Sequence, residues 1–253
     1  MLTHSSEQLA RTPEQLAHTP EQLAGTPEQL SDQDIKKIKE KLNELYTLIY
    51  NEMKIPFPSD SKFHKKVVKP EDFEVNIYYI SWTKDGNTKK ILVIVFGPGP
   101  LSNWFPVYIH DNDKYIYNSA EQMFINKKSD YSNANSKNEQ ILREINEATC
   151  PRVIQQKGRE FDMNITEWNE NSNRHLTETI CLKFSQNPNF LKFLEILHQN
   201  NIYIIEGTED KKYGMGLKFD PANPDHLNST NWPGDMELTY IYENVKKALF
   251  SPK

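Results

Sequence analysis

Residues 74–97, "EVNIYYISWTKDGNTKKILVIVFG", decide the fold class of this chain. Two runs rich in β-branched and aromatic residues flank Asp85 and Gly86, and such runs are typical of β-strands. An Asp-Gly pair between two such runs indicates the tight turn that joins antiparallel strands. The stretch therefore predicts a β-hairpin.

Helical periodicity dominates the sequence beyond this hairpin. The apolar run "IYIIEG" at 202–207 predicts one more strand, whereas "MELTYIYENVKKALF" at 236–250 predicts a closing helix. Apolar residues recur with helical spacing in further segments: 119–129, 136–147, 151–160, 171–186 and 188–200. Many helices with few strands predict a mostly helical α+β domain with a small sheet, which we assign to residues 70–253.

The N-terminal residues form a heptad repeat. Its units are "HSSEQLA", "RTPEQLA", "HTPEQLA" and "GTPEQLS". Thr and Pro in each "TPEQ" unit suit the start of a helix, but the same proline stops the helix of the preceding unit. One Leu per heptad buries too little apolar surface to offset the entropy of ordering the chain. We predict a flexible low-complexity arm at 1–30, with a partner-binding or oligomerising array as the alternative.

Residues 31–69 form a second predicted segment. A helix is predicted from Ser31, and the proline-bearing stretch "KIPFPSD" after it indicates a linker. Apolar residues recur in this helix at spacings of three and four: Ile35, Ile38, Leu42, Leu45 and Ile49. The helix is therefore amphipathic, and its apolar face must dock on another surface.

Composition excludes several classes of function. A formal net charge of −5 gives no general attraction to nucleic acid or to an anionic membrane. Two cysteines are too few for a disulfide framework or a structural zinc site. No apolar run approaches the ~20 residues that span a bilayer, and no signal peptide is evident, so we expect a cytoplasmic protein without a membrane partner.

Known cofactor and metal motifs are missing from the sequence. It contains no P-loop, GxGxxG, HExxH, CxxC or EF-hand pattern, and its seven histidines are scattered. We therefore expect neither a metal nor a cofactor. Any chemistry falls to carboxylates, lysines and aromatic side chains.

The stretch "SAEQMFINKK", which begins at Ser119, carries polar residues at the edge of an apolar helix face. Ser119 and Gln122 predict a capping box. Glu121 and Lys128 lie about 10.5 Å apart along a helix axis, too far for a direct ion pair but suited to reach one ligand from the same wall. Solvated boundary residues are the alternative, and periodicity alone places Lys127 closer to the centre of the apolar arc.

Several short motifs follow one another in a characteristic order. They are "LSNWFPV", "SAEQMFINKK", "KGRE", "EW" with Arg174 six residues on, "LKFSQN", "IEGTEDKKYGMG" and "NWPG". In this order and rough spacing the chain resembles the YbiA-like, or NADAR, domain family over residues 92–249. The family consists of N-glycosidases, so the resemblance implies an enzyme of that class.

The resemblance also implies the site. The family motif "S/AEH/QYFxxxK" places its Glu and Lys at Glu121 and Lys128, which chooses Lys128 over Lys127 as the second catalytic residue. Gly158 and Arg159 match the "GR" pair of the family. The implied substrate-binding residues are Asn103, Trp104, Arg159, Asp210, Tyr213 and Gly214. Arg159 is the candidate for binding phosphate, because its planar guanidinium matches two phosphate oxygens.

The sequence departs from the family pattern at three positions. Tyr213 replaces a tryptophan and keeps a ring face for stacking on the base. Thr177 replaces a methionine, and Tyr242 stands where an arginine is expected in the last helix. For Thr177 and Tyr242 the family pattern therefore does not predict how the side chain packs or which residue completes the binding of the anionic phosphate.

The family substrates are glycosylamines, in which ribose C1 is bonded to an exocyclic amine of a base. A neutral Lys128 would displace the base by transimination and form a Schiff base that water hydrolyses, while Glu121 donates and accepts protons. We expect ADP-ribosylated guanine to be the substrate, free or in DNA. Phosphorylated ribosylaminopyrimidine intermediates of riboflavin biosynthesis are the alternative.

Two hypotheses of other classes stay open. The departures at Thr177 and Tyr242 are compatible with a non-catalytic module that binds ADP-ribose or a nucleotide. A scaffold that acts through the arm at 1–30 would need a protein partner that the sequence does not identify. If DNA is a substrate, the acidic charge favours a single strand or a flipped base over a tightly bound duplex.

Overall fold

The computed structural model describes residues 30–53, 67–84, 86–97, 99–111 and 115–251. Within the chain, Ser31–Lys253 forms one compact unit. The predicted arm lies outside the described residues except for Leu30, and so does most of the predicted linker. The predicted domain boundaries therefore stay predictions.

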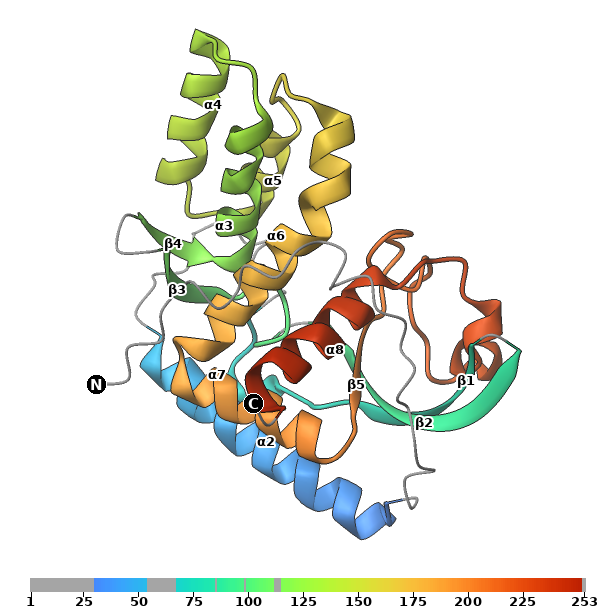
Figure 1. The fold of residues 1–253 in the computed structure, drawn as a ribbon. Coiled ribbons are helices and arrows are strands. Elements are labelled where there is room, and N and C mark those ends of the chain that lie inside the picture. Colours follow the sequence, from blue (N-terminus) through green and yellow to red (C-terminus); the bar gives the residue numbers. More distant parts are fainter. Residues whose placement is uncertain (1–29, 54–66, 85, 98, 112–114, 252–253) are drawn as a thin grey trace. The chain divides into compact units, whose positions relative to one another are not determined.

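The compact unit is mostly helical with a small sheet, which confirms the predicted α+β class (Figure 1). Its longer helices are α2 (Asp32–Glu52), α3 (Ala120–Asn126), α4 (Ser136–Glu147), α5 (Pro151–Gly158), α6 (Ile165–Ser185), α7 (Pro188–Gln199) and α8 (Glu237–Phe250). Its strands are β1 (Ile77–Lys84), β2 (Asn87–Phe96), β3 (Pro106–Asp111), β4 (Tyr115–Ser119) and β5 (Tyr203–Glu206). Short 3-10 helices are η3 (Pro70–Asp72), η4 (Lys127–Tyr131), η5 (Pro224–Leu227) and η6 (Ser229–Asn231).

The predicted hairpin forms the larger sheet. β1 and β2 pair antiparallel from Ile77 opposite Ile94 to Lys84 opposite Asn87, and Gly86 in the turn has φ of 76°, which favours glycine. β5 adds to the free edge of β2 in parallel, so the strand order is β1-β2-β5. β2 is therefore central, and this explains its run of buried aliphatic side chains.

The second sheet was not predicted. β3 and β4 form an antiparallel pair with an irregularity between Pro106 and Ile109. β4 exposes Tyr115 and Ile116 and buries Tyr117, so its apolar residues do not mark one buried face. The usual alternation of a half-buried strand is therefore weak in this segment.

Helix α2 docks on α7, as its apolar face requires. The Ser31 side chain caps the helix by accepting a hydrogen bond from the Asp34 amide at 3.2 Å. Tyr46 is fully buried and stacks on Phe73, with ring centres 3.6 Å apart. No helix among the described residues has the length and apolar character to cross a membrane.

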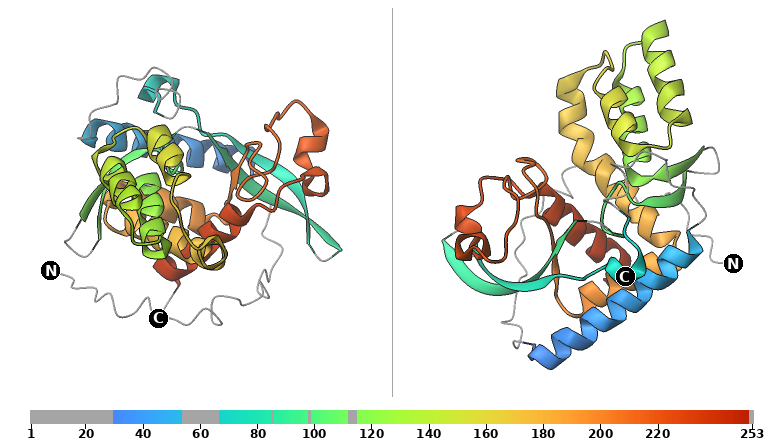
Figure 2. Two further views of the ribbon diagram at one scale, coloured as in Figure 1. Left: turned by 90° about the horizontal axis from the view of Figure 1, so that it is seen from above. Right: turned by 180° about the vertical axis from the view of Figure 1, so that it is seen from behind.

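The long helix α6 joins two groups of helices (Figure 2). It contacts α3 of the first group, in which α3, α4 and α5 pack on one another. It also contacts α7 and α8 of the second group, and α8 packs on β5. These contacts bring α3, α5 and α6 together, and the loop after β2 reaches α3, where the Asn103 carbonyl accepts a hydrogen bond from the Glu121 amide.

Candidate active site

The start of α3 is fixed by the predicted capping residues. The Ser119 side chain accepts a hydrogen bond from the Gln122 amide at 3.1 Å. The Gln122 side chain accepts from the Asn118 amide at 2.7 Å, so the second half of the capping box is shifted by one residue. Its amide group donates to the Ala148 carbonyl at the end of α4. Glu121 therefore projects from a helix turn with a fixed start.

Glu121 is a buried carboxylate that two other segments hold in place. The residue is 6% exposed, and its backbone amide donates to the Asn103 carbonyl at 2.9 Å. The side chains of Trp104 and Gln155 donate hydrogen bonds to the carboxylate. The loop after β2 and helix α5 therefore meet α3 at this group.

The electrostatic surroundings of Glu121 suit acid–base chemistry. Burial raises the pKa of Glu121 to about 7 from its ordinary value of 4.5. The charge of Lys128 opposes this rise in pKa, and the charge of Glu206 adds to it. At neutral pH the side chain is therefore divided between its protonated and ionised forms, as a general acid–base group requires.

Lys128 lies on η4, just beyond the end of α3. Its amine donates to the Gly158 carbonyl at 2.8 Å and lies 5.5 Å from the centre of the Trp168 ring. Burial lowers the pKa of Lys128, the charge of Glu121 raises it and the charge of Arg159 lowers it. The net decrease in pKa enlarges the neutral, nucleophilic fraction of the amine.

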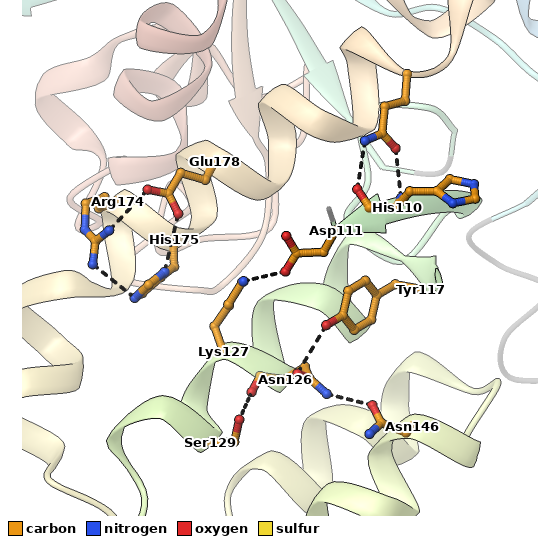
Figure 3. A network of polar contacts seen from close by, with 11 residues as sticks. His110, Asp111, Tyr117, Asn126, Lys127, Ser129, Asn146, Arg174, His175 and Glu178 are labelled. Carbon is orange, nitrogen blue, oxygen red and sulfur yellow. Dashed lines mark hydrogen bonds and ion pairs between the residues drawn. The ribbon is translucent and has the colours of Figure 1, made fainter. Parts of the chain in front are cut away.

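Lys127 has a different partner. Its amine forms an ion pair with Asp111 on β3, with 2.7 Å between nitrogen and oxygen (Figure 3). Lys127 thus ties the end of α3 to β3, whereas Lys128 is the lysine whose charge acts on Glu121. Helical periodicity alone favoured Lys127 and did not anticipate this division.

Gly158 lets α5 approach α3 closely. A Cβ atom at this position would clash with Cγ2 of Ile125, so a larger residue would push the two helices apart. The close approach brings the Gly158 carbonyl against Lys128. Arg159 follows as the C-cap of α5 and is exposed, so its guanidinium borders the site on the solvent side.

Asp210 and Gly214 shape the turn that carries Tyr213. The Asp210 carboxylate accepts hydrogen bonds from the amides of Lys212 at 2.9 Å and Tyr213 at 2.8 Å. A Cβ atom on Gly214 would lie 2.9 Å from the Glu206 carbonyl oxygen, so the turn packs tightly on the end of β5. These two predicted residues therefore have clear positioning roles within the turn.

Tyr213 lies near enough to Glu121 to be affected by its charge. Burial raises the pKa of Tyr213 to about 12, and the charge of Glu121 is among the groups that act on it. Its hydroxyl group is hydrogen-bonded to the Ser172 side chain on α6, and the Lys212 amine lies 5.1 Å from its ring centre. The ring is thereby fixed between α6 and the turn.

Two residues of the site were missed by the sequence analysis. Glu206 ends β5 and places a second carboxylate near Glu121, and Gln155 on α5 donates to Glu121. A charged residue directly after a buried apolar strand, as in "IYIIE", is the pattern that indicates Glu206. Gln155 lies on a short polar helix and has no comparable pattern.

Aromatic side chains around Trp168 pack against η4. Trp168 is 6% exposed, as expected for a core residue, and its ring centre lies 5.2 Å from that of Phe124. Tyr131 contacts the Trp168 ring edge-on, and its hydroxyl is hydrogen-bonded to His175 Nε2 at 2.6 Å. Beside this group, Arg174 pairs with Glu178 at 3.2 Å (Figure 3).

The remaining family departures are accommodated internally. The Thr177 hydroxyl donates to the Asn173 carbonyl at 2.7 Å, so it is satisfied within α6. Tyr242 is 0% exposed, and its hydroxyl donates to the Leu101 carbonyl in the loop after β2. Tyr242 therefore packs this loop, and its side chain is not placed to bind an anion.

Other features of the described residues do not define a site of their own. A cavity of about 260 Å³ lies between the segment before β1, the end of β2 and α7, and no predicted site residue lines it. No group of three or more His, Cys, Asp or Glu side chains among the described residues has an arrangement that would hold a metal ion. The convergence of Glu121 and Lys128 defines the candidate site instead.

A family model and two known proteins are similar to this chain. The model of the NADAR domain family matches residues 94–250. The chain is 30% identical over 154 residues to an N-glycosidase of Acanthamoeba polyphaga mimivirus. The matched segment covers 58% of this chain and 85% of the relative. The solution structure of the E. coli protein YbiA is similar with a TM-score of 0.45 and 18% identity, over 59% of this chain and 77% of that chain.

Proposed function

Since the chain belongs to the NADAR domain family, we propose that it is an N-glycosidase that cleaves the bond between ribose C1 and an exocyclic amine of a base. The similarity to a viral N-glycosidase supports this reaction class. The observation that carries the proposal is the pairing of Glu121, whose pKa is about 7, with Lys128, whose pKa is lowered. Such a pair supplies a proton donor and a neutral amine at the same pH.

The first half of the proposed reaction transfers the sugar to Lys128. Protonated Glu121 gives its proton to the ring oxygen as the bond from C1 to that oxygen breaks, and the exocyclic nitrogen becomes an imine. The Lys128 amine adds to C1, and a proton passes from its nitrogen through Glu121 to the nitrogen of the base. The bond from C1 to the base then breaks, so the base leaves as a free amine and a Schiff base remains on Lys128.

The second half of the reaction restores the enzyme. Water adds to C1 of the Schiff base while ionised Glu121 accepts its proton. The bond between C1 and the Lys128 nitrogen breaks, the amine takes back a proton and the sugar leaves as an aldehyde that closes to its ring form. The reaction consumes one water molecule and needs no oxidant or reductant.

Several neighbouring side chains suit substrate binding. The Asn103 side-chain oxygen is buried without a hydrogen-bond partner among the described residues, and this supports a role as acceptor for a substrate hydroxyl or amine. The exposed guanidinium of Arg159 suits a phosphate group at the solvent side. The rings of Trp104 and Tyr213 offer faces for stacking on the base.

We propose ADP-ribosylated guanine as the substrate. The test is incubation with ADP-ribosylated guanine nucleotide, with modified single-stranded and duplex DNA, and with a ribosylaminopyrimidine phosphate, followed by mass spectrometry of the released base. Release of guanine is the expected result. Release from the pyrimidine phosphate alone would overturn the substrate and leave the roles of Glu121 and Lys128 standing. Failure to release any base would favour a module that only binds ADP-ribose.

On modified DNA, activity should depend weakly on salt and should be higher with single strands than with duplex. The net charge of −5 offers little neutralisation of backbone phosphates, and the modified base must leave the stack to reach a buried carboxylate. Initial rates across a salt series on matched single-stranded and duplex oligonucleotides measure both effects. A steep loss of activity between low and physiological salt would contradict this prediction.

Removal of the heptad arm should leave the chemistry unchanged. A chain that starts at Ser31 keeps every proposed site residue, because the first of them is Asn103. We expect it to retain the rate constant of the full chain in the same base-release assay. A large loss would mean that the arm contributes to the site or holds an active oligomer together, and light scattering of both chains would distinguish these causes.

A further inference from the structure

Three consecutive carbonyl groups of the loop before Trp104 are each held by a different helix. The donors are the Tyr242 hydroxyl on α8 to Leu101, the Lys183 amine on α6 to Ser102, and the Glu121 amide on α3 to Asn103. The next residue, Trp104, donates its indole N–H to the Glu121 carboxylate. The loop therefore links α8 and α6 to the acid–base group.

Lys183 is the unusual member of this set. It is 0% exposed, and its amine lies 5.4 Å from the ring centre of Phe184 and 5.8 Å from that of Phe190. Burial lowers the pKa of Lys183 to about 7, and no charged group among the described residues contributes to the shift. A buried amine without an ion-pair partner lowers the stability of the folded chain.

The hydrogen bond from Lys183 is not needed to satisfy its acceptor. The Ser102 carbonyl also accepts a hydrogen bond from the Phe105 amide at 3.0 Å, within the same loop. The contact from Lys183, at 2.8 Å, differs because it reaches the loop from α6. Its effect is therefore to fix where the loop lies relative to that helix.

We propose that Lys183 is a positioning residue, which holds the loop at Ser102 so that the Trp104 indole N–H reaches the Glu121 carboxylate. Its effect on catalysis rests on the proposed N-glycosidase function, whereas its effect on Trp104 does not. Without this anchor the loop is freer to move, and the hydrogen bond from Trp104 weakens. Because that bond lowers the pKa of Glu121, its loss shifts the proton affinity of the group upward.

The central test is Lys183→Met, which keeps an unbranched chain and removes the buried amine. Indole N–H resonances of the four tryptophans are followed against pH, with Trp104→Phe to assign the signal. In the wild type the Trp104 resonance should titrate with Glu121, near pH 7. In Lys183→Met the pH-dependent change in the chemical shift of the Trp104 indole N–H should become smaller, and its midpoint pH should rise. The kcat/KM for base release should fall by up to about 10²-fold.

Thermal unfolding of the same variant separates positioning from general stability. The pKa of Lys183 is lowered when folded, so the wild type loses stability as pH falls from 10.5, the ordinary value, toward 7. Lys183→Met removes this loss. At pH 7 the variant should therefore unfold at a temperature at least as high as the wild type, although it is less active. A purely structural lysine would not give lower activity together with undiminished stability.

Lys246→Met is the matched control. Lys246 is 3% exposed and also donates to a backbone carbonyl, at Ile202, but it pairs with Glu243 at 2.6 Å and does not touch the loop. Its loss should lower stability and leave the Trp104 titration unchanged. Lys183→Gln, which keeps a donor, should lie between the wild type and Lys183→Met, and it is the decisive comparison if Lys183→Met does not fold.

The outcomes distinguish this inference from the proposed function. An unchanged Trp104 titration in folded Lys183→Met, or in Lys183→Gln if the methionine variant does not fold, would overturn the positioning role. A changed titration with no base release in any variant, wild type included, would uphold the positioning role and refute the N-glycosidase activity. An equal effect of Lys246→Met on Trp104 would also overturn the inference, because the effect would then belong to any buried lysine.

Discussion

Lys128→Ala should abolish base release and leave the fold intact. The variant removes the proposed nucleophile, and no other lysine is described as acting on Glu121. The structural loss is small, since the amine makes one hydrogen bond among the described residues, to the Gly158 carbonyl, beside its contact with the Trp168 ring. Base release by mass spectrometry and thermal unfolding measure the two effects. Full activity in the folded variant would refute the Schiff-base mechanism.

Lys127→Ala is the matched control for this prediction. The adjacent lysine is paired with Asp111 and does not share the surroundings of Lys128. Its removal should cost some stability, because both partners of the pair are only about one fifth exposed, at 22% and 19%. Base release should continue in this variant. Borohydride added during turnover should trap a sugar adduct on Lys128 in the wild type and in Lys127→Ala, and none in Lys128→Ala.

The different surroundings of Lys127 and Lys128 show a limit of predictions from helical periodicity. A helical wheel assumes a turn of about 100° for every residue, and on that basis Lys127 points nearer the apolar face. The α-helix ends at Asn126, and the chain tightens into a 3-10 helix from Lys127 onward. Directions beyond that point no longer follow the wheel. Only the family motif selected Lys128.

Local sequence rules predicted the parts of the fold that local interactions decide. The Asp-Gly hairpin, the cap at Ser31 and the start of α3 at Ser119 each depend on residues a few positions apart. The site depends on contacts between distant segments instead. Glu121 meets Gln155 and Glu206 only because α5 and β5 pack near α3, and no spacing in the sequence encodes that meeting.

Lys183 illustrates the same point from the core. In sequence it is one lysine in the apolar stretch "ICLKF" near the end of a predicted helix, and the usual expectation for a lysine is an exposed position. The structure buries it among phenylalanine rings and points its amine at Ser102, 81 residues earlier in the chain. Tertiary packing of α6 overrides the preference of the side chain for water.

Glu121→Gln should lower the rate of base release by at least ~10²-fold, the usual effect of removing one general acid–base group. Glutamine keeps the shape of the side chain and an oxygen that accepts from Trp104, but it neither donates nor accepts a proton at neutral pH. Single-turnover rates on ADP-ribosylated guanine nucleotide give the chemical step directly. A near-normal rate would assign Glu121 a structural role only.

The same variant should become more stable relative to the wild type as pH rises. The pKa of Glu121 is about 7 when folded and 4.5 when unfolded, so between these values the folded state binds more protons. The contribution of Glu121 to the free energy of unfolding is therefore fully present below pH 4.5 and declines as pH rises through 7. At pH 8 about 3 kcal/mol of it is lost. Glutamine does not titrate and escapes the loss.

Thermal unfolding at pH 5 and pH 8 measures the difference. The unfolding temperatures of Glu121→Gln and wild type should lie close together at pH 5, and the variant should unfold at the higher temperature at pH 8. A gap that is equal at both pH values would mean that Glu121 has an ordinary pKa in the folded chain. The residue would then stay ionised at neutral pH, and it could not give the proton that opens the sugar ring.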